Sequence, residues 1–118
     1  SCIMRFFEPS EQRLRKCGVV EVSSEDLVLG MEEKPSEPRS HWGCPPFYYY
    51  TRKDASLISA GITAGCGTDA PGSYIAWLST QTPVHAMEMP GHRYDIGNLE
   101  SYHTVCEQYD GIHPTTTK

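Results

Sequence analysis

The sequence has no stretch long and apolar enough to cross a bilayer. Its hydrophobic runs extend over a few residues, whereas a membrane span needs roughly 20. No signal-peptide pattern follows Ser1, and no dense cluster of lysine and arginine occurs. With a formal net charge of -5 at pH 7, the chain is poorly suited to binding nucleic acid through phosphates. These absences favour a soluble, cytoplasmic protein without membrane or nucleic-acid partners.

The sequence also lacks the cysteine and histidine patterns of metal sites. Its cysteines are odd in number and include no Cys-x-x-Cys pair, so neither a disulfide framework nor a zinc ribbon is expected. The histidines lack the spacing of zinc ligands on a helix, and we expect them at the surface. No Gly-x-Ser-x-Gly elbow supports nucleophilic catalysis. We predict reduced, mostly buried thiols at Cys2, Cys17, Cys44, Cys66 and Cys106.

The length and composition are those of one folded domain. The chain has 118 residues, of which 38% are hydrophobic and 21% are charged. This balance predicts a modest core rather than disorder. We predict a single domain over residues 1–110 and a tail over 111–118, because Asp110-Gly111 ends the last predicted helix.

The first half of the chain predicts strands joined by turns and loops. Runs of apolar residues and β-formers predict strands over 2–7, 18–22, 27–32 and 47–50. The second and third of these are joined by four polar residues, which predicts a β-hairpin. The charged stretch 8–16 predicts an exposed connection, and four prolines predict a loop over 35–46.

The second half predicts helices. Thr51 has a capping-box-like spacing ahead of a short helix that ends near Gly61. Asp69-Ala70-Pro71-Gly72 begins a second helix, which ends near Gln81. A strand follows over 84–89, and Asn98 caps a third helix over 99–109. Because strands and helices interleave, we predict an α/β fold with a mixed β-sheet and packed helices.

The motif Glu32-Glu33-Lys34-Pro35 places a carboxylate beside an ammonium group at a strand end. Lys34 is able to meet an anionic oxygen there, and Glu33 to accept hydrogen bonds from hydroxyl groups. The alternative is a solvated strand end with an incidental charge pair.

Asp95 and the run 47–50 offer further candidates. Asp95 stands just before a helix and is able to bind a divalent cation, since Mg²⁺ takes one or two carboxylates together with substrate phosphates. The alternative is a turn aspartate that caps nearby amides. The tyrosines of 47–50 are able to stack on a sugar or a base. The alternative is a buried strand in which some tyrosine hydroxyls contact solvent.

An ordered series of motifs resembles the carboxyl-terminal half of the sugar-phosphate nucleotidyltransferases. The series is GVVEV, LVLGMEEKP, PPFYYY, DAPGSYIAWL, PVHAME and GHRYDIGNLESY. The family includes glucose-1-phosphate thymidylyltransferases and mannose-1-phosphate guanylyltransferases. The resemblance runs from about Cys2 to Tyr109, and it implies the carboxyl-terminal part of a Rossmann-like nucleotidyltransferase fold.

In that family a sugar 1-phosphate oxygen attacks the α-phosphate of a nucleoside triphosphate, pyrophosphate leaves, and Mg²⁺ bridges the phosphates. The resemblance implies that Glu33 binds sugar hydroxyls and that Lys34 binds the sugar phosphate. It also implies that Tyr48 lines the sugar pocket and that Asp95 is one of two Mg²⁺-binding aspartates. Such a transfer depends on charge neutralisation and alignment.

Some features of the family are missing from these residues. Neither the Gly-Gly-x-Gly-Thr-Arg-Leu loop that cradles the triphosphate nor the Gly-Asp strand with the other metal aspartate occurs. Pro46 stands in place of a family glycine, which removes a backbone N–H, and Asn98 replaces a threonine. We therefore expect a truncated homologue that keeps the sugar-phosphate-binding half and is inactive alone for nucleotidyl transfer.

Three readings follow from this expectation. In the first, a complementary chain supplies the missing half. In the second, this chain is a non-catalytic sugar-phosphate-binding module. In the third it is a homo-oligomeric interaction module, because half of a central sheet leaves a strand edge and apolar surface that proteins usually cover.

Overall fold

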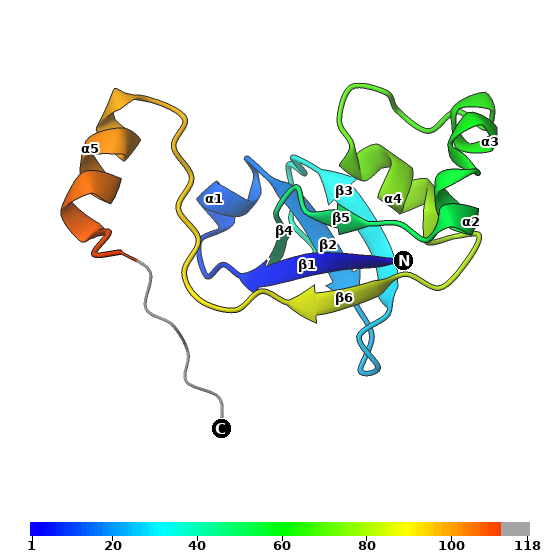
Figure 1. Ribbon diagram of the computed structural model, residues 1–118, viewed down its shortest axis with the longest axis horizontal. Coiled ribbons are helices and arrows are strands. Elements are labelled where there is room, and N and C mark those ends of the chain that lie inside the picture. Colours follow the sequence, from blue (N-terminus) through cyan, green and yellow to red (C-terminus); the bar gives the residue numbers. More distant parts are fainter. Residues whose placement is uncertain (112–118) are drawn as a thin grey trace.

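The computed structural model describes residues 1–111, in which strands and helices interleave (Figure 1). The fold is mixed α/β, as predicted; residues 112–118 of the predicted tail lie outside the described part. The strands are β1 (Cys2–Phe7), β2 (Gly18–Val22), β3 (Val28–Glu33), β4 (Trp42–Cys44), β5 (Tyr48–Tyr49) and β6 (His85–Glu88). The helices are α1 (Glu11–Leu14), α2 (Arg52–Ala55), α3 (Ile58–Thr63), α4 (Gly72–Leu78) and α5 (Leu99–Gln108).

The six strands form one sheet in which β1 has three neighbours. The first half of β1 pairs with β5 and its second half with β4, both antiparallel. β6 pairs with β1 in parallel. The predicted hairpin is present as β2 and β3, and β2 joins it to β4, giving the order β3-β2-β4-β1-β5. The combination of parallel and antiparallel pairs makes the sheet mixed.

The turn of the β2–β3 hairpin lies against β6. Asp26 in this turn adopts a φ of 61°, and its carbonyl accepts the N–H of Ala86 at 2.8 Å. Its carboxylate pairs with Arg5 of β1 at 2.9 Å. The Arg5 guanidinium also lies 4.3 Å from the centre of the Trp42 ring. These contacts hold the hairpin against the body of the sheet and occupy part of the free edge of β6.

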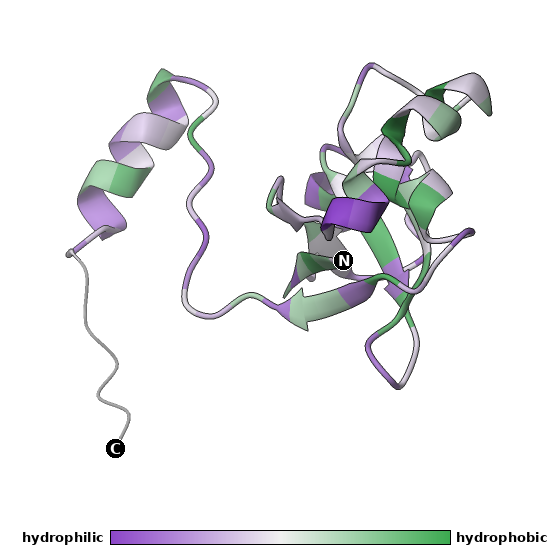
Figure 2. Ribbon diagram, turned by 45° about the vertical axis from the view of Figure 1, so that its right-hand side comes forward, coloured by the Kyte–Doolittle hydropathy of each residue, from purple (hydrophilic) through white to green (hydrophobic). Residues whose placement is uncertain are grey.

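The hydrophobic core lies between one face of the sheet and α4. Figure 2 shows hydrophobic residues on this helix and on the strands beside it. Tyr74 of α4 is buried, and its hydroxyl donates to the carbonyl of Asp54 in α2. The buried residues of the core are Ile3, Val20, Val28, Cys44, Tyr74, Ile75, Leu78, Val84 and Ala86.

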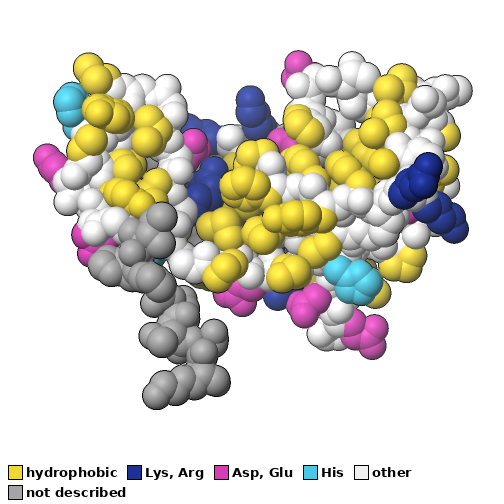
Figure 3. Space-filling view, viewed as in Figure 1, with side chains coloured by type: hydrophobic (Ala, Val, Ile, Leu, Met, Phe, Trp, Pro, Cys, Tyr) yellow, Lys and Arg dark blue, Asp and Glu magenta, His cyan; other side chains and the backbone are white. Residues whose placement is uncertain are grey.

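The opposite face of β1, β5 and β6 is much more open. Side chains alternate between the two faces of a strand, so Ile3 and Ala86 point into the core while their neighbours point away. We call this second side the outer face. Figure 3 shows hydrophobic side chains gathered over these strands. The pairing register places Cys2, Met4, Phe6, Tyr49, His85 and Met87 on the outer face.

The predicted third helix is present as α5 and stands away from the sheet (Figure 1). Asn98 is its N-cap, as predicted, and no residue of the helix is buried. Leu99 is 70% exposed, and Tyr102 and Tyr109 are each 49% exposed. The helix therefore depends more on local contacts than on packing against the core.

Two segments predicted as irregular contain short elements. β4 lies inside the proline-rich stretch, where Gly43 leaves room for the Phe6 ring of the paired strand. α1 lies inside the predicted exposed connection; Ser10 caps it and its Leu14 is fully buried. A one-dimensional pattern of prolines or charges does not reveal such tertiary partners.

The predicted helix ending near Gly61 is instead two helices, and Gly61 lies inside the second. A Cβ on Gly61 would lie 2.9 Å from a Trp77 ring carbon, so close helix packing accounts for this glycine.

The thiol prediction is also corrected: all cysteines are free, but only Cys44 is buried. Over residues 1–111, no helix is long and apolar enough to span a membrane.

Candidate functional site

The Glu32-Glu33-Lys34-Pro35 motif lies at the end of β3. Glu33 pairs with Gly18 of β2 and is half-buried, whereas Lys34 is exposed. The Lys34 N–H donates to the carbonyl of Cys17 at 3.0 Å. Lys34 has a φ of 47°, in the left-handed region that favours glycine. Backbone strain of this kind clusters at functional sites, so this strand end is a candidate site.

The Glu33 carboxylate lies between two glycines. Its oxygens stand next to Gly72 at the start of α4 and within contact distance of a Cβ placed on Gly18. Among residues 1–111, its side chain makes no hydrogen bond or ion pair. A half-buried carboxylate without a polar partner is available to accept hydrogen bonds from the hydroxyls of a ligand.

The charge of Glu33 raises the pKa of three nearby ionisable side chains. Burial raises the pKa of the Cys44 thiol to about 12, and the negative charge of Glu33 adds to this effect. Burial is the largest cause of the raised pKa of the Tyr48 hydroxyl, and the charges of Cys44 and then Glu33 add to it. The Cys17 thiol also has a raised pKa, first because of burial. These three groups are therefore neutral at physiological pH, and none of them forms an ion pair with Glu33.

Tyr48 is positioned by β5 and by a row of aromatic rings. It pairs with Ile3 of β1, and its half-buried side chain packs against the core. Its ring stacks on Tyr50 with centroids 6.3 Å apart, and Tyr50 contacts Tyr74 of α4 at 5.6 Å. Tyr49 points to the other side and is 57% exposed. Tyr48 thus lies on the same side of the sheet as Glu33 and α4.

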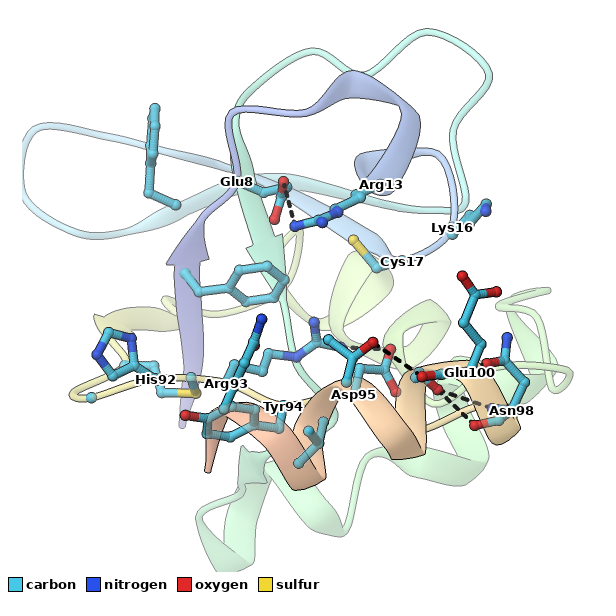
Figure 4. A pocket seen from close by; sticks show the side chains of 18 of the residues that line it. Glu8, Arg13, Lys16, Cys17, His92, Arg93, Tyr94, Asp95, Asn98 and Glu100 are labelled. Carbon is cyan, nitrogen blue, oxygen red and sulfur yellow. Dashed lines mark hydrogen bonds and ion pairs between the residues drawn. The ribbon is translucent and has the colours of Figure 1, made fainter. Parts of the chain in front are cut away.

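Asp95 lies on a groove of about 850 Å³ between α5 and the α1 end of the sheet (Figure 4). The Asp95 side chain is 73% exposed and forms an ion pair with Arg93 at 3.2 Å. Arg93 in turn lies 4.5 Å from the centre of the Phe6 ring. The opposite wall of the groove includes Arg13 and Cys17. The carboxylate is therefore accessible, but a cation of the chain already occupies one side of it.

Cys17 connects the two predicted motifs. Its carbonyl holds the backbone of Lys34, and its thiol lines the groove that contains Asp95. The charges of both Glu33 and Asp95 raise the pKa of this thiol, while Arg93 lowers it. The structure thus brings Glu33 and Lys34 close to Cys17 and places Asp95 across the groove, while Tyr48 lies near Glu33 and Cys44. Sequence reasoning missed this role of Cys17; its position directly before the strand that pairs with Glu33 was the available signal.

The sequence of residues 2–111 matches the family model for nucleotidyl transferases. The chain belongs to the nucleotidyl transferase family. This agrees with the resemblance inferred from the ordered motifs, although the match does not distinguish one half of the family fold from the other. No curated protein matches the sequence.

Solved structures show the same fold for this nucleotidyl transferase family member. A protein described as a glucose-1-phosphate thymidylyltransferase from Bacillus anthracis, in complex with sucrose, aligns with a TM-score of 0.67 and 20% identity. A UDP-glucose pyrophosphorylase complexed with UDP-glucose aligns with a TM-score of 0.69 and 21% identity. The alignments cover 98% and 92% of this chain but only 45% and 44% of those proteins. The chain therefore spans less than half the length of either.

Residues 1–111 of this family member contain no cluster of three or more potential metal ligands, counting histidine, cysteine, aspartate and glutamate side chains. Asp95 is the one predicted ligand there, and Arg93 competes for its oxygens. Mg²⁺ demands octahedral oxygen coordination, which a single ion-paired carboxylate does not provide.

Proposed function

We propose that residues 1–111 bind a sugar 1-phosphate as the sugar-phosphate-binding half of a nucleotidyl transferase. The observation that carries the proposal is the Glu33 carboxylate, which is half-buried and has no polar partner among residues 1–111. It adjoins Lys34, the exposed cation whose backbone is fixed by Cys17. Family membership and the two sugar nucleotide enzymes that share the fold support a ligand of this class.

In this proposal, Glu33 accepts hydrogen bonds from sugar hydroxyls and the ammonium of Lys34 neutralises the phosphate. Tyr48 provides an aromatic wall beside them. The 118 residues contain no Gly-Gly-x-Gly-Thr-Arg-Leu loop, so this polypeptide alone binds the sugar phosphate without transferring a nucleotidyl group. Full activity then requires residues that supply the triphosphate site, in the same protein or in a complementary chain.

Magnesium remains a prediction for Asp95 alone. A Mg²⁺ contact at this carboxylate requires that Arg93 moves aside and that substrate phosphates complete the coordination. Titrations of the sugar phosphate with and without Mg²⁺, on wild type and Asp95→Asn, test this contact. A Mg²⁺-dependent gain in affinity that disappears in Asp95→Asn supports it, and an identical response of the two proteins refutes it.

The proposal is tested by protein-observed NMR titration with glucose 1-phosphate and mannose 1-phosphate. We expect saturable shifts near Glu33 and Lys34 in the wild type, and binding weakened by about tenfold or more in Lys34→Ala, since bonds to charged groups contribute about 1.5–3 kcal/mol. Lys53→Ala is the matched control, because Lys53 is an exposed lysine on α2. Glucose and inorganic phosphate are titrated separately.

Either of two results rejects the sugar-phosphate proposal. The first is the absence of shifts at millimolar sugar phosphate. The second is equal loss of binding in Lys34→Ala and Lys53→Ala, which reports only the net charge of the protein. Shifts produced by inorganic phosphate as strongly as by the sugar phosphates mean an anion site without sugar recognition, and they contradict the role given to Glu33.

The outer face favours a second candidate function, that of a homo-oligomeric interaction module. Met87 is 55% exposed and Tyr49 is 57% exposed, on strands that flank β1. Exposed apolar surface on the face of a sheet is typical of an interaction site. Its test is the state of association in solution, together with variants of the outer face.

A further inference from the structure

Two side chains of β3 reach the first residue of α4. Met31 and Glu33 are two positions apart on the strand, so they point to the same side of the sheet. A Cβ built on Gly72 would overlap both the Glu33 Oε1 atom and the Met31 methyl group. A Cβ on Gly18, in the neighbouring strand, would lie 2.7 Å from the same methyl group and 3.4 Å from Glu33 Oε1. The two glycines therefore enclose the ends of Met31 and Glu33.

Backbone conformation does not explain these two glycines. The glycines of residues 1–111 with positive φ are Gly65, Gly91 and Gly111, and neither Gly18 nor Gly72 is among them. Any L-residue is able to adopt the backbone angles at both positions. At Gly72, the nearest atoms to an added Cβ belong to the Glu33 carboxylate and the Met31 methyl group, which occupy the space of a side chain.

We propose that Gly72 is a positioning residue for Glu33, which sets where the carboxylate stands and therefore which hydroxyl of a bound sugar it meets. The inference rests on the function proposed above for Glu33. Gly72 is the first residue of α4 and Glu33 the last of β3, so this contact also couples the position of the helix to the ligand site. A larger residue at Gly72 displaces the Glu33 carboxylate from its present position on the α4 side of the sheet.

The atoms in contact distinguish a positioning role from a purely structural one. At Gly72, an added Cβ meets the mobile ends of two flexible side chains, which are able to move without disturbing the backbone. At Gly61, an added Cβ meets the rings of Trp77 and Tyr74, which are held by packing in the core. Gly72→Ala is therefore expected to change the site more than the stability, and Gly61→Ala the reverse.

The experiment compares Gly72→Ala and Gly61→Ala with the wild type. Glucose 1-phosphate affinity is measured by NMR titration, and thermal stability is measured by a melting curve. The methyl resonance of ¹³C-labelled Met31 reports the packing of the Met31 and Glu33 side chains against Gly72. The other three methionines serve as internal references. We expect Gly72→Ala to shift the Met31 methyl and to weaken sugar phosphate binding about tenfold or more, as for loss of a hydrogen bond to a charged group. Gly61→Ala lowers the melting temperature and leaves the affinity unchanged.

A rescue variant tests the steric mechanism. Glu33→Asp shortens the side chain by one methylene, so in the Gly72→Ala background it relieves the overlap of the carboxylate with the added methyl group and leaves only that of Met31. We expect this double variant to bind glucose 1-phosphate more tightly than Gly72→Ala alone, whereas Glu33→Asp in the wild-type background weakens binding. If the two changes are simply additive, the positioning role is rejected.

The possible failures are separable. If the wild type does not bind glucose 1-phosphate, the proposed function fails. The Met31 methyl resonance still reports whether Gly72 determines the position of the Met31 and Glu33 side chains. An unchanged resonance in Gly72→Ala overturns the inference. Unfolding of Gly72→Ala overturns it as well, since the contacted atoms are then not free to move. Unchanged sugar phosphate affinity in a folded Gly72→Ala that does shift the methyl also refutes the positioning role.

Discussion

The charge of Glu33 acts on thiols that have different surroundings. Cys44 is buried, Cys17 is half-buried, and both have a raised pKa because of burial and of nearby negative charge. A thiol reacts with alkylating reagents as its thiolate, so a raised pKa slows the reaction. Cysteine reactivity therefore reports on the electrostatics of the candidate site without any ligand.

We predict that Cys44 resists alkylation in the native protein. With a pKa of about 12 against an ordinary value of 9.0, its thiolate fraction at pH 8 is about a thousandfold below that of an ordinary thiol. Replacing Glu33 with glutamine removes one of the charges that raise this pKa, so labelling of Cys17 and Cys44 becomes faster. Iodoacetamide labelling followed by peptide mass spectrometry measures both rates, with exposed Cys106 as the reference.

Glu32→Gln is the matched control for this measurement. Glu32 neighbours Glu33 in sequence but is exposed, and its charge is not among those that raise the pKa of either thiol. Equal acceleration by Glu32→Gln and Glu33→Gln shows that only net charge matters. Labelling of Cys44 as rapid as that of Cys106 contradicts the burial of Cys44 itself.

The sequence shows which candidate residues adjoin each other in the chain, but not the contacts that form only in the folded structure. Glu33 and Lys34 adjoin each other in the chain, so their combination was visible, and the structure places Tyr48 on their side of the sheet. Gly72 was interpreted as part of a helix start, because nothing local shows that a glutamate 39 positions earlier occupies the space of its side chain. Cys17 was treated only as one of several free thiols.

At the scale of elements, two helices with similar caps differ in what supports them. The Thr51 hydroxyl accepts the Asp54 N–H in α2, whose Asp54 is buried. Asn98 accepts the Ser101 N–H at 2.8 Å in α5, which has no buried residue. A helix of this length is marginal in water without tertiary packing, so the cap has a larger share in the stability of α5.

We predict that Asn98→Ala opens α5 locally. Loss of an N-cap costs about 1 kcal/mol, which corresponds to roughly fivefold faster hydrogen exchange in the helix. The melting temperature of the sheet is unchanged, because α5 contributes no buried residue. Hydrogen exchange monitored by mass spectrometry checks the first effect and a melting curve the second.

Thr51→Ala provides the contrasting variant, since it removes the cap of a helix packed on the body. It is expected to lower the melting temperature and to leave exchange in α5 as in the wild type. If Asn98→Ala lowers the melting temperature as much as Thr51→Ala, α5 packs on the sheet in solution. An unchanged exchange rate in Asn98→Ala means that the capping box does not limit the opening of the helix.

The elements with strong local signals were predicted and the weaker ones were not. The β2–β3 hairpin and the capped α5 have their periodicity and turn residues within one short segment. β4 has three residues inside a proline-rich stretch and exists because it pairs with β1 and β2. Its formation depends on partners more than 20 positions away, which a local pattern does not contain.

At the scale of the whole molecule, the two sides of the sheet are covered unequally. α4 packs on one side, where the core residues gather, while the outer face carries exposed Met87 and Tyr49. Soluble proteins rarely leave an apolar patch of more than a few hundred Å² in contact with water. A partner surface is therefore expected on the outer face.

We predict that this polypeptide self-associates through the outer face at micromolar concentration. Met87→Glu places a charge in the middle of this face and is expected to shift the protein to the monomer in sedimentation velocity. Ile62→Glu is the matched control, because Ile62 is 51% exposed but lies on α3, which packs against α4 on the other side of the sheet. Both substitutions add the same charge at an exposed apolar side chain, so a difference between them reports on the place of contact rather than on solubility. A wild type that stays monomeric without aggregating contradicts self-association, and dispersal by Ile62→Glu as complete as by Met87→Glu contradicts the assignment to this face.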